Sequence, residues 1–399
     1  MKDLRTLDRL DVAGQGVLVR VDFNVPMQNG VVTSDTRVRQ AVPTLAELAS
    51  KGAKVIVASH MGRPKGKVVP GLSLEPVAQI LRTHMPQTDI KFVGDTIGAA
   101  AKTASQALSP GQILMLENLR YLPGEENNDK DVIKGLAQLA DLYVDDAFSC
   151  AHRAHASVEG IARHLPAVAG RLMAREIDAL TAALENPARP LTAVIGGSKI
   201  STKLGVLENL VTNVQNLVIG GAMANTVFLA DGLDVGSSLC EPDMADTVKR
   251  IQAEALAQGC ELILPSDVVT APALDAGIVS KTVGIDEVPA DQMILDVGPK
   301  SVARLATVFA QSKTIVWNGP LGAFEVPPFD DGTQAAARRV ADLTASGEVM
   351  SIAGGGDTVA ALEAAHAADG FSYVSMAGGA FLEWLEGRTL PGVAVLQDI

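Results

Sequence analysis

Arginines recur in the N-terminal half of the chain wherever an aliphatic run ends or a helix-like stretch begins. Arg20, Arg37, Arg63, Arg120 and Arg153 all occupy such positions. A guanidinium binds a phosphate or a carboxylate through two parallel hydrogen bonds. Any one of these residues could be an ordinary surface arginine, but five coincidences are improbable. We therefore predict one basic pocket, built from several loops, for a small ligand that carries more than one negative charge.

Polar side chains accompany these arginines in two of the loops. Along the run RVDFN, strand alternation places Arg20, Asp22 and Asn24 on one face. Such a triplet could also be a buried cluster whose members satisfy one another. A second loop pairs His60 with Arg63 across a glycine, directly after an aliphatic run. A lone histidine is usually structural, but this pair at the end of a strand favours a bound anion.

Two adjacent carboxylates follow another aliphatic run. Asp145 and Asp146 open the segment DDAFSCAHRAH, which also carries Arg153. Paired carboxylates can bind a metal ion or serve as acid and base. We prefer the interpretation in which they orient the basic groups beside them.

Glycine-rich turns characterise the C-terminal half. Four of them follow aliphatic runs, namely GGSKISTK at 196–203, GGAMAN at 220–225, NGPLGAFE at 318–325 and GGGDT at 354–358. Glycine lets backbone N–H groups approach an anion closely, and a helix N-terminus adds a favourable dipole. The first turn lacks the P-loop spacing G-x-x-x-x-G-K-[ST]. The turns nevertheless predict a phosphate-binding edge in this half.

Several side chains in these turns leave alternatives open. Lys199 and Lys203 are four residues apart, so on a helix they would share one face. Gly221 could admit a flat nucleobase or could serve tight packing, and the motif alone favours neither. Asp357 and Thr358 could cap a helix. Alternatively, Asp357 could hold Mg²⁺ on a nucleotide phosphate, since magnesium keeps most of its waters and needs few protein ligands.

Other reaction classes lack their motifs. Gly14 and Gly16 begin like a dinucleotide-binding fingerprint, but Val19 stands at the third glycine position and the turn precedes a strand. A dehydrogenase is therefore disfavoured. No Ser–His–Asp or Cys–His arrangement suggests a covalent nucleophile. No Lys/Arg-rich run indicates nucleic-acid binding.

The elements that must position these residues alternate almost throughout the chain. Strand-like aliphatic runs are expected at 16–23, 54–59, 90–93, 112–116, 142–145, 191–195, 216–219, 261–264, 314–317, 348–352 and 372–375. Helix-like amphipathic stretches are expected at 36–50, 76–83, 131–140, 202–211, 243–257, 333–345 and 358–368. This alternation predicts an α/β protein with mainly parallel sheets and helices on both faces. Ligands of such sheets bind at the carboxyl ends of the strands.

The length of 399 residues indicates two domains, because single cores seldom grow so large. Eleven strands also fit two sheets better than one. A helix is expected from Gly170 to Leu184, ended by the sequence Glu-Asn-Pro. We therefore predict an N-terminal lobe at 1–169, an inter-lobe helix at 170–185 and a C-terminal lobe at 186–387. The last ten residues are apolar and show no helical period.

Composition narrows the class of protein further. Hydrophobic residues make up 47% and aromatic residues 4%, so the cores must be aliphatic. Residues 1–185 carry no net charge, so the net charge of −13 lies in the rest. This split suits an anionic ligand on the first half, or it reflects solubility alone. We expect no signal peptide and no transmembrane helix, because neither the N-terminus nor the rest of the sequence has a long apolar run. The three scattered cysteines suit a reducing, cytoplasmic setting.

Taken together and in order, these strings resemble the phosphoglycerate kinase family. The matching segments are RVDFNVP, SHMGRP, ENLRY, DDAFSCAHRAHAS, GGSKISTK, GGAMANT, WNGPLGAFE and GGGDT. They run from Arg20 to Thr358, and the similarity spans essentially the whole chain. Asp145, Ser149 and Cys150 stand where the family more often has Asn, Gly and Thr. None of these departures removes a charged contact residue, so we expect an active enzyme.

The resemblance implies two Rossmann-like lobes joined by a helix across a central cleft. 3-Phosphoglycerate or 1,3-bisphosphoglycerate would contact Arg20, Asp22, Asn24, Arg37, His60, Arg63, Arg120 and Arg153 on the N-terminal lobe. ADP or ATP would contact Lys203, Gly221, Asn318, Glu325, Gly355, Gly356, Asp357 and Thr358 on the other lobe, with Mg²⁺ held by Asp357. The tail at 388–399 would return to the N-terminal lobe, where the apolar segment Val393–Leu396 could pack.

The resemblance also implies a glycolytic reaction, a reversible in-line transfer between 1,3-bisphosphoglycerate and Mg·ADP with lobe closure and no covalent intermediate. Arg37, Lys199, Gly354, Gly355 and Gly356 are the expected catalytic residues, acting by positioning and charge stabilisation. We expect a monomer that acts on small molecules. A related enzyme for another small anion and a metabolite-binding protein without turnover are the alternatives. The charged residues at the transfer point disfavour the latter.

Overall fold

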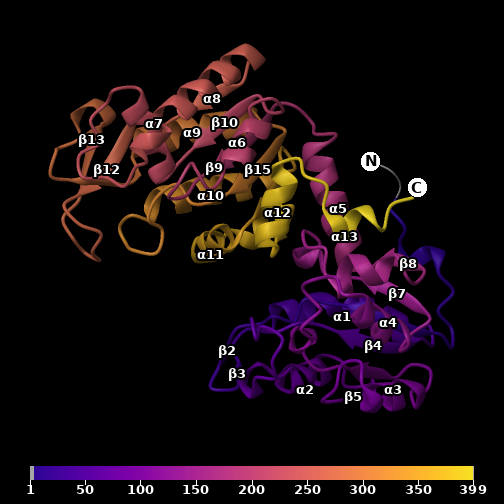
Figure 1. Ribbon diagram of the computed structural model, residues 1–399. Coiled ribbons are helices and arrows are strands. Elements are labelled where there is room, and N and C mark those ends of the chain that lie inside the picture. The colour runs from indigo at the N-terminus through magenta and orange to yellow at the C-terminus, as the bar shows by residue number, and fades with distance from the viewer. Residues whose placement is uncertain (1–3, 399) are drawn as a thin grey trace. The chain divides into compact units, whose positions relative to one another are not determined.

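The computed structural model describes residues 4–398. The chain divides into two compact units, Met1–Asp178 together with Thr389–Ile399, and Ala179–Arg388. The division falls within helix α5 (Arg171–Leu184), so residues of this helix belong to both units. In each unit helices lie along a central sheet (Figure 1).

The first unit contains, within its described residues, a six-stranded parallel sheet. The strand order is β5 (Ile90–Phe92), β6 (Ile113–Met115), β4 (Lys54–Ala58), β1 (Gly16–Arg20), β7 (Leu142–Asp145) and β8 (Ala167–Ala169). The central strands β1 and β4 are buried over four of their five residues, as expected for strands covered on both faces. Arg20, Ala58 and Asp145 lie side by side at the carboxyl ends of three adjacent strands.

Helices and short turns complete this unit. The helices are α1 (Thr36–Ser50), α2 (Glu75–His84), α3 (Ala99–Gln106), α4 (Lys130–Ala137) and α13 (Pro391–Ala394). A small antiparallel hairpin joins β2 (Met27–Gln28) and β3 (Val31–Val32). In α1, Val38, Ala41, Leu45 and Leu48 are buried at three- and four-residue spacing. This stripe packs against the valines of β1 and β4, which form the aliphatic core that the composition predicts.

The end of the chain packs within the first unit. Leu390, Val393 and Leu396 are buried, and the N–H of Gly392 donates to the carbonyl of Ala151 at 2.8 Å. The segment forms the short helix α13, whereas the sequence shows no helical period here. The reason is length, because four residues make a single turn and cannot display a periodic apolar face.

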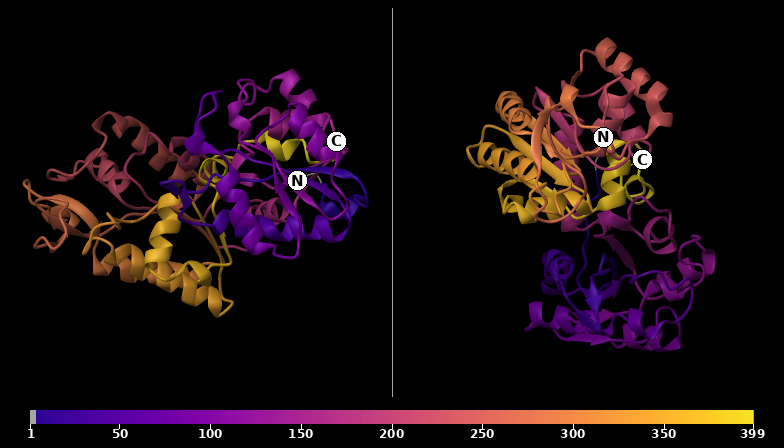
Figure 2. Two further views of the ribbon diagram at one scale, coloured as in Figure 1. Left: turned by 90° about the horizontal axis from the view of Figure 1, so that it is seen from below. Right: turned by 90° about the vertical axis from the view of Figure 1, so that its left-hand side faces the viewer.

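The second unit contains a six-stranded parallel sheet among its described residues. The strand order is β11 (Glu261–Ile263), β10 (Asn216–Ile219), β9 (Leu191–Ile195), β15 (Thr314–Asn318), β16 (Met350–Gly354) and β17 (Tyr373–Ser375). The helices are α6 (Leu204–Leu210), α7 (Ala222–Ala230), α8 (Ala245–Gln258), α9 (Pro299–Gln311), α10 (Asp331–Ala345), α11 (Gly356–Ala364) and α12 (Gly378–Leu385). They cover both faces of the sheet (Figure 2, right). The expectation of two mainly parallel α/β sheets is thus confirmed.

A second, antiparallel sheet in this unit was not expected. Its strand order is β13 (Lys281–Gly284), β12 (Asp267–Ala271) and β14 (Met293–Val297). No α-helix separates these three strands, and only the short 3-10 helix Ile285–Glu287 lies between β13 and β14, so a search for alternating strands and helices passes over them. The sheet matters for function because residues of β12 and β14 line the cavity of this unit.

No helix among residues 4–398 combines the length and the apolar character that a membrane crossing requires.

Candidate active site

The loops after β1, β4, β6 and β7 meet at one edge of the sheet in the first unit, because these strands are parallel neighbours in register. Asn118 ties two of the loops together. Its side chain donates to the carbonyl of Met61 at 2.8 Å and accepts from the N–H of Met61 at 3.1 Å. Asn118 therefore holds the loops after β4 and β6 together at this edge. Asn118 carries no charge, and no pattern in the sequence separates it from its neighbours.

Arg37, at the start of α1, reaches back to the loop after β1. Its Nη1 donates to Asp22 Oδ2 at 2.7 Å and to the carbonyl of Asn24 at 3.1 Å. The side chain of Asn24 accepts from the N–H of Gly62 at 2.9 Å. About a quarter of the Arg37 side chain stays exposed (28%), so donors of its guanidinium are available to an anion. The pairing with Asp22 therefore orients the guanidinium of Arg37 and leaves part of it free to bind an anion.

The strand that carries Arg20 is shorter than expected. We predicted a strand from 16 to 23, but β1 ends at Arg20 because its neighbours end at Ala58 and Asp145. Beyond that point Asp22 Oδ1 accepts from the N–H of Asn24, which closes a local turn. The alternating face expected for these polar residues therefore does not extend past Arg20.

His60, Arg120 and Arg153 gather beside this turn. Arg120 Nη1 donates to the carbonyl of Gly62 at 2.6 Å, and its Nε lies 3.2 Å from Glu126. Burial, together with the charges of Arg20, Arg120 and Arg153, holds the pKa of His60 well below its usual range. His60 is therefore neutral at pH 7.

The remaining predicted arginine, Arg63, lies in the same loop as His60 and is exposed. Arg20, by contrast, is only 1% exposed. The predicted phosphoglycerate contacts at this edge thus fall into two groups of residues, one buried and one accessible to solvent. Arg20 belongs to the buried group and does not face solvent.

Asp145 and Asp146 do not share one role. Asp146 Oδ1 accepts from the N–H groups of Leu172 and Met173 at 2.9 and 3.2 Å, so this carboxylate caps α5. The charge of Arg175 also acts on Asp146 and favours its ionised form, so its role at the start of α5 adds to the expected influence of a neighbouring basic group. Asp145 accepts from the N–H of Ala147, and its second oxygen is buried without a hydrogen-bond partner among the described residues. Burial raises the pKa of Asp145 to about 7 and the pKa of Asp146 to about 6.

Replacement of Asp145 by asparagine should stabilise the protein more at pH 8 than at pH 5, by roughly 2.7 kcal/mol. The pKa of Asp145 is about 7 in the fold against an ordinary 3.8, so the native state keeps a proton that the unfolded state releases as pH rises. Stability from this group is therefore lost between about pH 4 and 7. Urea unfolding at both pH values measures the difference. Asp131→Asn, at an exposed site, is the control, and an equal gain at both pH values would contradict the assignment.

The loops after β9, β15 and β16 form the corresponding edge in the second unit. Asn318 is the register neighbour of Ile195, and Trp317 of Ala353. Lys203 Nζ joins two of these loops by donating to the carbonyls of Gly196 at 2.6 Å and Asn318 at 3.2 Å. Burial lowers the pKa of Lys203 to about 8.

The expected helix face with two lysines does not exist. Helix α6 begins at Leu204, so Lys199 and Lys203 both precede it. The carboxylate of Glu241 accepts from the N–H and the hydroxyl of Ser201 in the turn that precedes this helix. Lys199 is exposed, whereas Lys203 points inward to the two carbonyls.

The glycine run at the end of β16 forms the N-terminus of α11. Gly354 is the last strand residue, Gly355 has a φ of +103° and Gly356 is the first helical residue. A Cβ at Gly355 would lie 2.7 Å from Asn318 Nδ2, so only glycine fits. The hydroxyl of Thr358 accepts from the N–H of Gly319 at 2.7 Å and is buried. Thr358 therefore fastens this turn to the loop after β15.

Gly221 is packed closely against a neighbouring loop, as its tight-packing interpretation requires. Its φ is +64°, and a Cβ there would lie 2.7 Å from the carbonyl of Gly197. The same residue lines the cavity of this unit, so its small size also leaves space for a ligand. The two interpretations are compatible in the structure.

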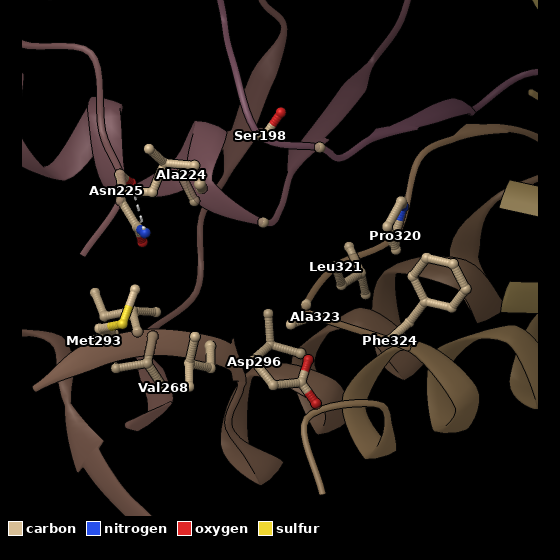
Figure 3. A pocket seen from close by; sticks show the side chains of 18 of the residues that line it. Ser198, Ala224, Asn225, Val268, Met293, Asp296, Pro320, Leu321, Ala323 and Phe324 are labelled. Atoms are coloured by element: carbon tan, nitrogen blue, oxygen red, sulfur yellow. Dashed lines mark hydrogen bonds between the residues drawn. The ribbon is translucent and has the colours of Figure 1, made fainter. Parts of the chain in front are cut away.

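A cavity of about 360 Å³ opens at this edge. Its apolar part lies between the start of α7 and the antiparallel sheet, where Val268 and Met293 face Ala224 and Asn225 (Figure 3). Ser198, Glu325 and Asp357 lie on its wall as well. An apolar slot next to a glycine-rich helix N-terminus suits a flat ring joined to phosphates.

Some cavity residues could not be found from motifs. Val268, Met293 and Asp296 come from the antiparallel sheet that the sequence did not reveal. Asp296 is buried, and one of its oxygens accepts from the N–H of Gly332 at 2.7 Å. Burial raises its pKa to about 7.

The residues at the start of α11 fit a magnesium ion carried by nucleotide phosphates. Asp357 is exposed on the cavity wall, and its carboxylate accepts no hydrogen bond from residues 4–398. A free carboxylate beside backbone N–H groups offers the oxygen ligand that Mg²⁺ prefers, while phosphates and waters complete its shell. Asp357 does not cap the helix, since Gly355 occupies the N-cap position.

Comparison with known proteins shows the family of this chain. The family model described as Phosphoglycerate kinase matches residues 7–388. A phosphoglycerate kinase from a Ruegeria species is 59% identical over 98% of this chain and 99% of its own length, and one from Caulobacter vibrioides is 54% identical over 99% of each.

Solved structures of the same family are similar to this chain as well. The phosphoglycerate kinase of Coxiella burnetii is 42% identical, with a TM-score of 0.91 over 99% of this chain and 98% of that one. The enzyme of Pyrococcus horikoshii is 28% identical, with a TM-score of 0.83 over 98% of both chains. The chain belongs to the phosphoglycerate kinase family.

Proposed function

We propose that the chain is a glycolytic kinase that transfers a phosphoryl group reversibly between 1,3-bisphosphoglycerate and Mg·ADP, giving 3-phosphoglycerate and ATP. One observation carries this proposal. The chain is a member of the family, and it has an arginine-bearing edge in one unit and a glycine-rich edge with a cavity in the other. Two edges of complementary character suit two different phosphorylated ligands.

The first unit would bind the phosphoglycerate. The accessible donors at its edge are the guanidinium of Arg37, the exposed Arg63 and the half-buried Arg153. Arg120, His60, Asp22 and Asn24 would orient these donors or contact the ligand directly, and each is held by hydrogen bonds to a neighbouring loop or faces the same cluster of charges. Several guanidinium groups match a ligand with a phosphate and a carboxylate.

The second unit would bind the nucleotide. The base would occupy the apolar part of the cavity beside Gly221, and the phosphates would lie at the N–H groups of Gly355 and Gly356. Asp357 would hold Mg²⁺, which neutralises phosphate charge when bound. Glu325 lies on the cavity wall, and Lys203, Asn318 and Thr358 hold the loops that frame the phosphate end.

The chemistry needs no general base, because the attacking group is already an anion, either a phosphate oxygen of ADP or the carboxylate of 3-phosphoglycerate. Arg37 and Lys199, with the N–H groups of Gly354–Gly356, would stabilise charge on the transferring phosphoryl oxygens. Direct in-line transfer without a covalent intermediate requires the two ligands to meet. We therefore include closure of the two units during turnover in the proposal.

A coupled assay for ATP formation from 1,3-bisphosphoglycerate and Mg·ADP tests the function. We expect turnover with this substrate and little or none with acetyl phosphate, which lacks the second charged group. ATP formation from acetyl phosphate but not from 1,3-bisphosphoglycerate would show that the enzyme acts on a different small anion. Binding of both ligands without any turnover would favour a metabolite-binding protein.

We also propose a cytoplasmic monomer. Both ligand edges belong to one chain, and Cys150, Cys240 and Cys260 are free, which suits a reducing compartment. Sedimentation at micromolar concentration checks the oligomeric state, and a stable dimer would contradict this part of the proposal.

A further inference from the structure

Arg20 is the fully buried member of the arginine set, and each of its donor nitrogens has a partner inside the protein. Its Nε donates to Ser157 Oγ at 3.0 Å, and its Nη1 donates to the carbonyl of Val21. Its Nη2 lies 3.1 Å from Nδ1 of His60. With 1% of its surface exposed, Arg20 offers no donor to a dissolved ligand.

A buried carboxylate, Glu125, binds the serine that contacts this arginine. Glu125 is 1% exposed, and its carboxylate accepts from the hydroxyl of Ser157 and from the N–H of Ser157 at 3.2 Å. The chain of contacts therefore runs from Glu125 through Ser157 to Arg20 and ends at the His60 ring. Three buried side chains fix the position of one imidazole nitrogen.

The chemistry of this contact assigns the proton on His60. A guanidinium has five N–H donors and no acceptor, so Nδ1 must accept in the bond from Arg20 Nη2. A neutral imidazole carries one N–H, which then lies on Nε2. A charged imidazolium would place two donors face to face at this contact. The low pKa of His60 agrees with a neutral ring.

The alternative occupant of this position would be a metal ion. Ligand atoms of Asp22, His60 and Cys150 lie within 4.8 Å of one another, a spacing that a metal could use. Arg20 Nη2 lies 3.1 Å from the histidine nitrogen and 3.6 Å from Cys150 Sγ. A cation is therefore already present among these groups, and it is the guanidinium.

We propose that Arg20 is a positioning residue that locks His60 in the Nε2–H tautomer, so that His60 presents a neutral N–H donor to the phosphoglycerate. Nε2 is the ring atom left for a ligand, since it makes no hydrogen bond with residues 4–398 and the residue keeps 5% of its surface exposed. This inference rests on the proposed function for the identity of the ligand. It assigns Arg20 to the support of a contact residue and removes it from the set that touches substrate.

The tautomer can be measured in the unaltered enzyme. In protein labelled with ¹⁵N-histidine, we expect His60 to show an unprotonated Nδ1 and a protonated Nε2 at pH 7, with His60→Gln assigning its signals among six histidines. A protonated Nδ1, or a doubly protonated ring, would overturn the proposal. This readout does not depend on turnover, so its failure is distinct from failure of the proposed function.

A double-mutant cycle shows whether Arg20 acts through His60. Arg20→Met should raise KM for 3-phosphoglycerate about tenfold, the equivalent of ~1.4 kcal/mol, while KM for ATP stays constant. In the His60→Leu background the same change should have little further effect, because the ring that it positions is gone. Additive effects, or equal loss for both substrates, would overturn the proposal. Arg82→Met removes a half-buried arginine that donates to a backbone carbonyl of the same unit, and it should leave both KM values unchanged.

Discussion

Replacement of Arg37 by alanine should lower kcat by a factor of about 100 to 1000, the loss that follows removal of one preorganised charge-stabilising donor (~2.7–4 kcal/mol). The pairing with Asp22 at 2.7 Å and with the Asn24 carbonyl fixes the direction of this guanidinium before the ligand binds. Its exposed quarter is then available for phosphoryl oxygens. Steady-state kinetics with both substrates saturating measure the change directly.

The neighbouring Arg39 supplies a matched control for this experiment. It lies on the same helix and pairs with Asp35 at 3.0 Å, but it is exposed and makes no contact with the loop after β1. Arg39→Ala should leave kcat within a factor of about two, as expected for a surface ion pair of small energy. Arg37→Lys should recover part of the activity, because it restores the charge without the planar fork. A near-normal kcat in Arg37→Ala would remove Arg37 from the catalytic set.

The sequence located the two edges because the strands that carry them are buried and parallel. β7, β9 and β10 have the residues expected of them, since each is an uninterrupted aliphatic run between polar segments. Strands that end beside a shorter neighbour were less well predicted. Strand β1 ends at Arg20 because the neighbouring strands end beside it, and no property of the run RVDFN itself marks that point.

The orientation of individual side chains depends on partners that are distant in sequence. Arg20 and Arg37 are the same residue type near the same loop. Arg20 is buried and donates to Ser157, whereas Arg37 is partly exposed. The partner of Arg20 lies 137 residues away, so no local pattern separates the two roles. Helix α7 was not predicted from the sequence, because its residues are apolar on almost every side and show no amphipathic period.

Replacement of Asp357 by alanine should lower kcat/KM for the Mg-nucleotide by about two orders of magnitude while KM for 3-phosphoglycerate changes little. A bound divalent ion stabilises phosphate charge by several kcal/mol, and the exposed Asp357 carboxylate at the start of α11 is the oxygen ligand that we propose for it. Because the site that we propose for 3-phosphoglycerate belongs to the other unit, the affinity for this substrate should not depend on Asp357. Initial rates over a grid of Mg²⁺ and ATP concentrations separate the two effects.

Magnesium dependence distinguishes this role from a structural one. Loss of a metal ligand should raise the Mg²⁺ concentration needed for half-maximal activity, and excess Mg²⁺ should restore part of the rate. A helix-capping role would instead lower the unfolding midpoint and leave the Mg²⁺ requirement unchanged. Glu363→Ala, an exposed acid near the far end of the same helix, controls for surface charge and should behave as the unaltered enzyme. Equal loss of affinity for both substrates in Asp357→Ala would show that the residue supports the fold and does not hold the metal.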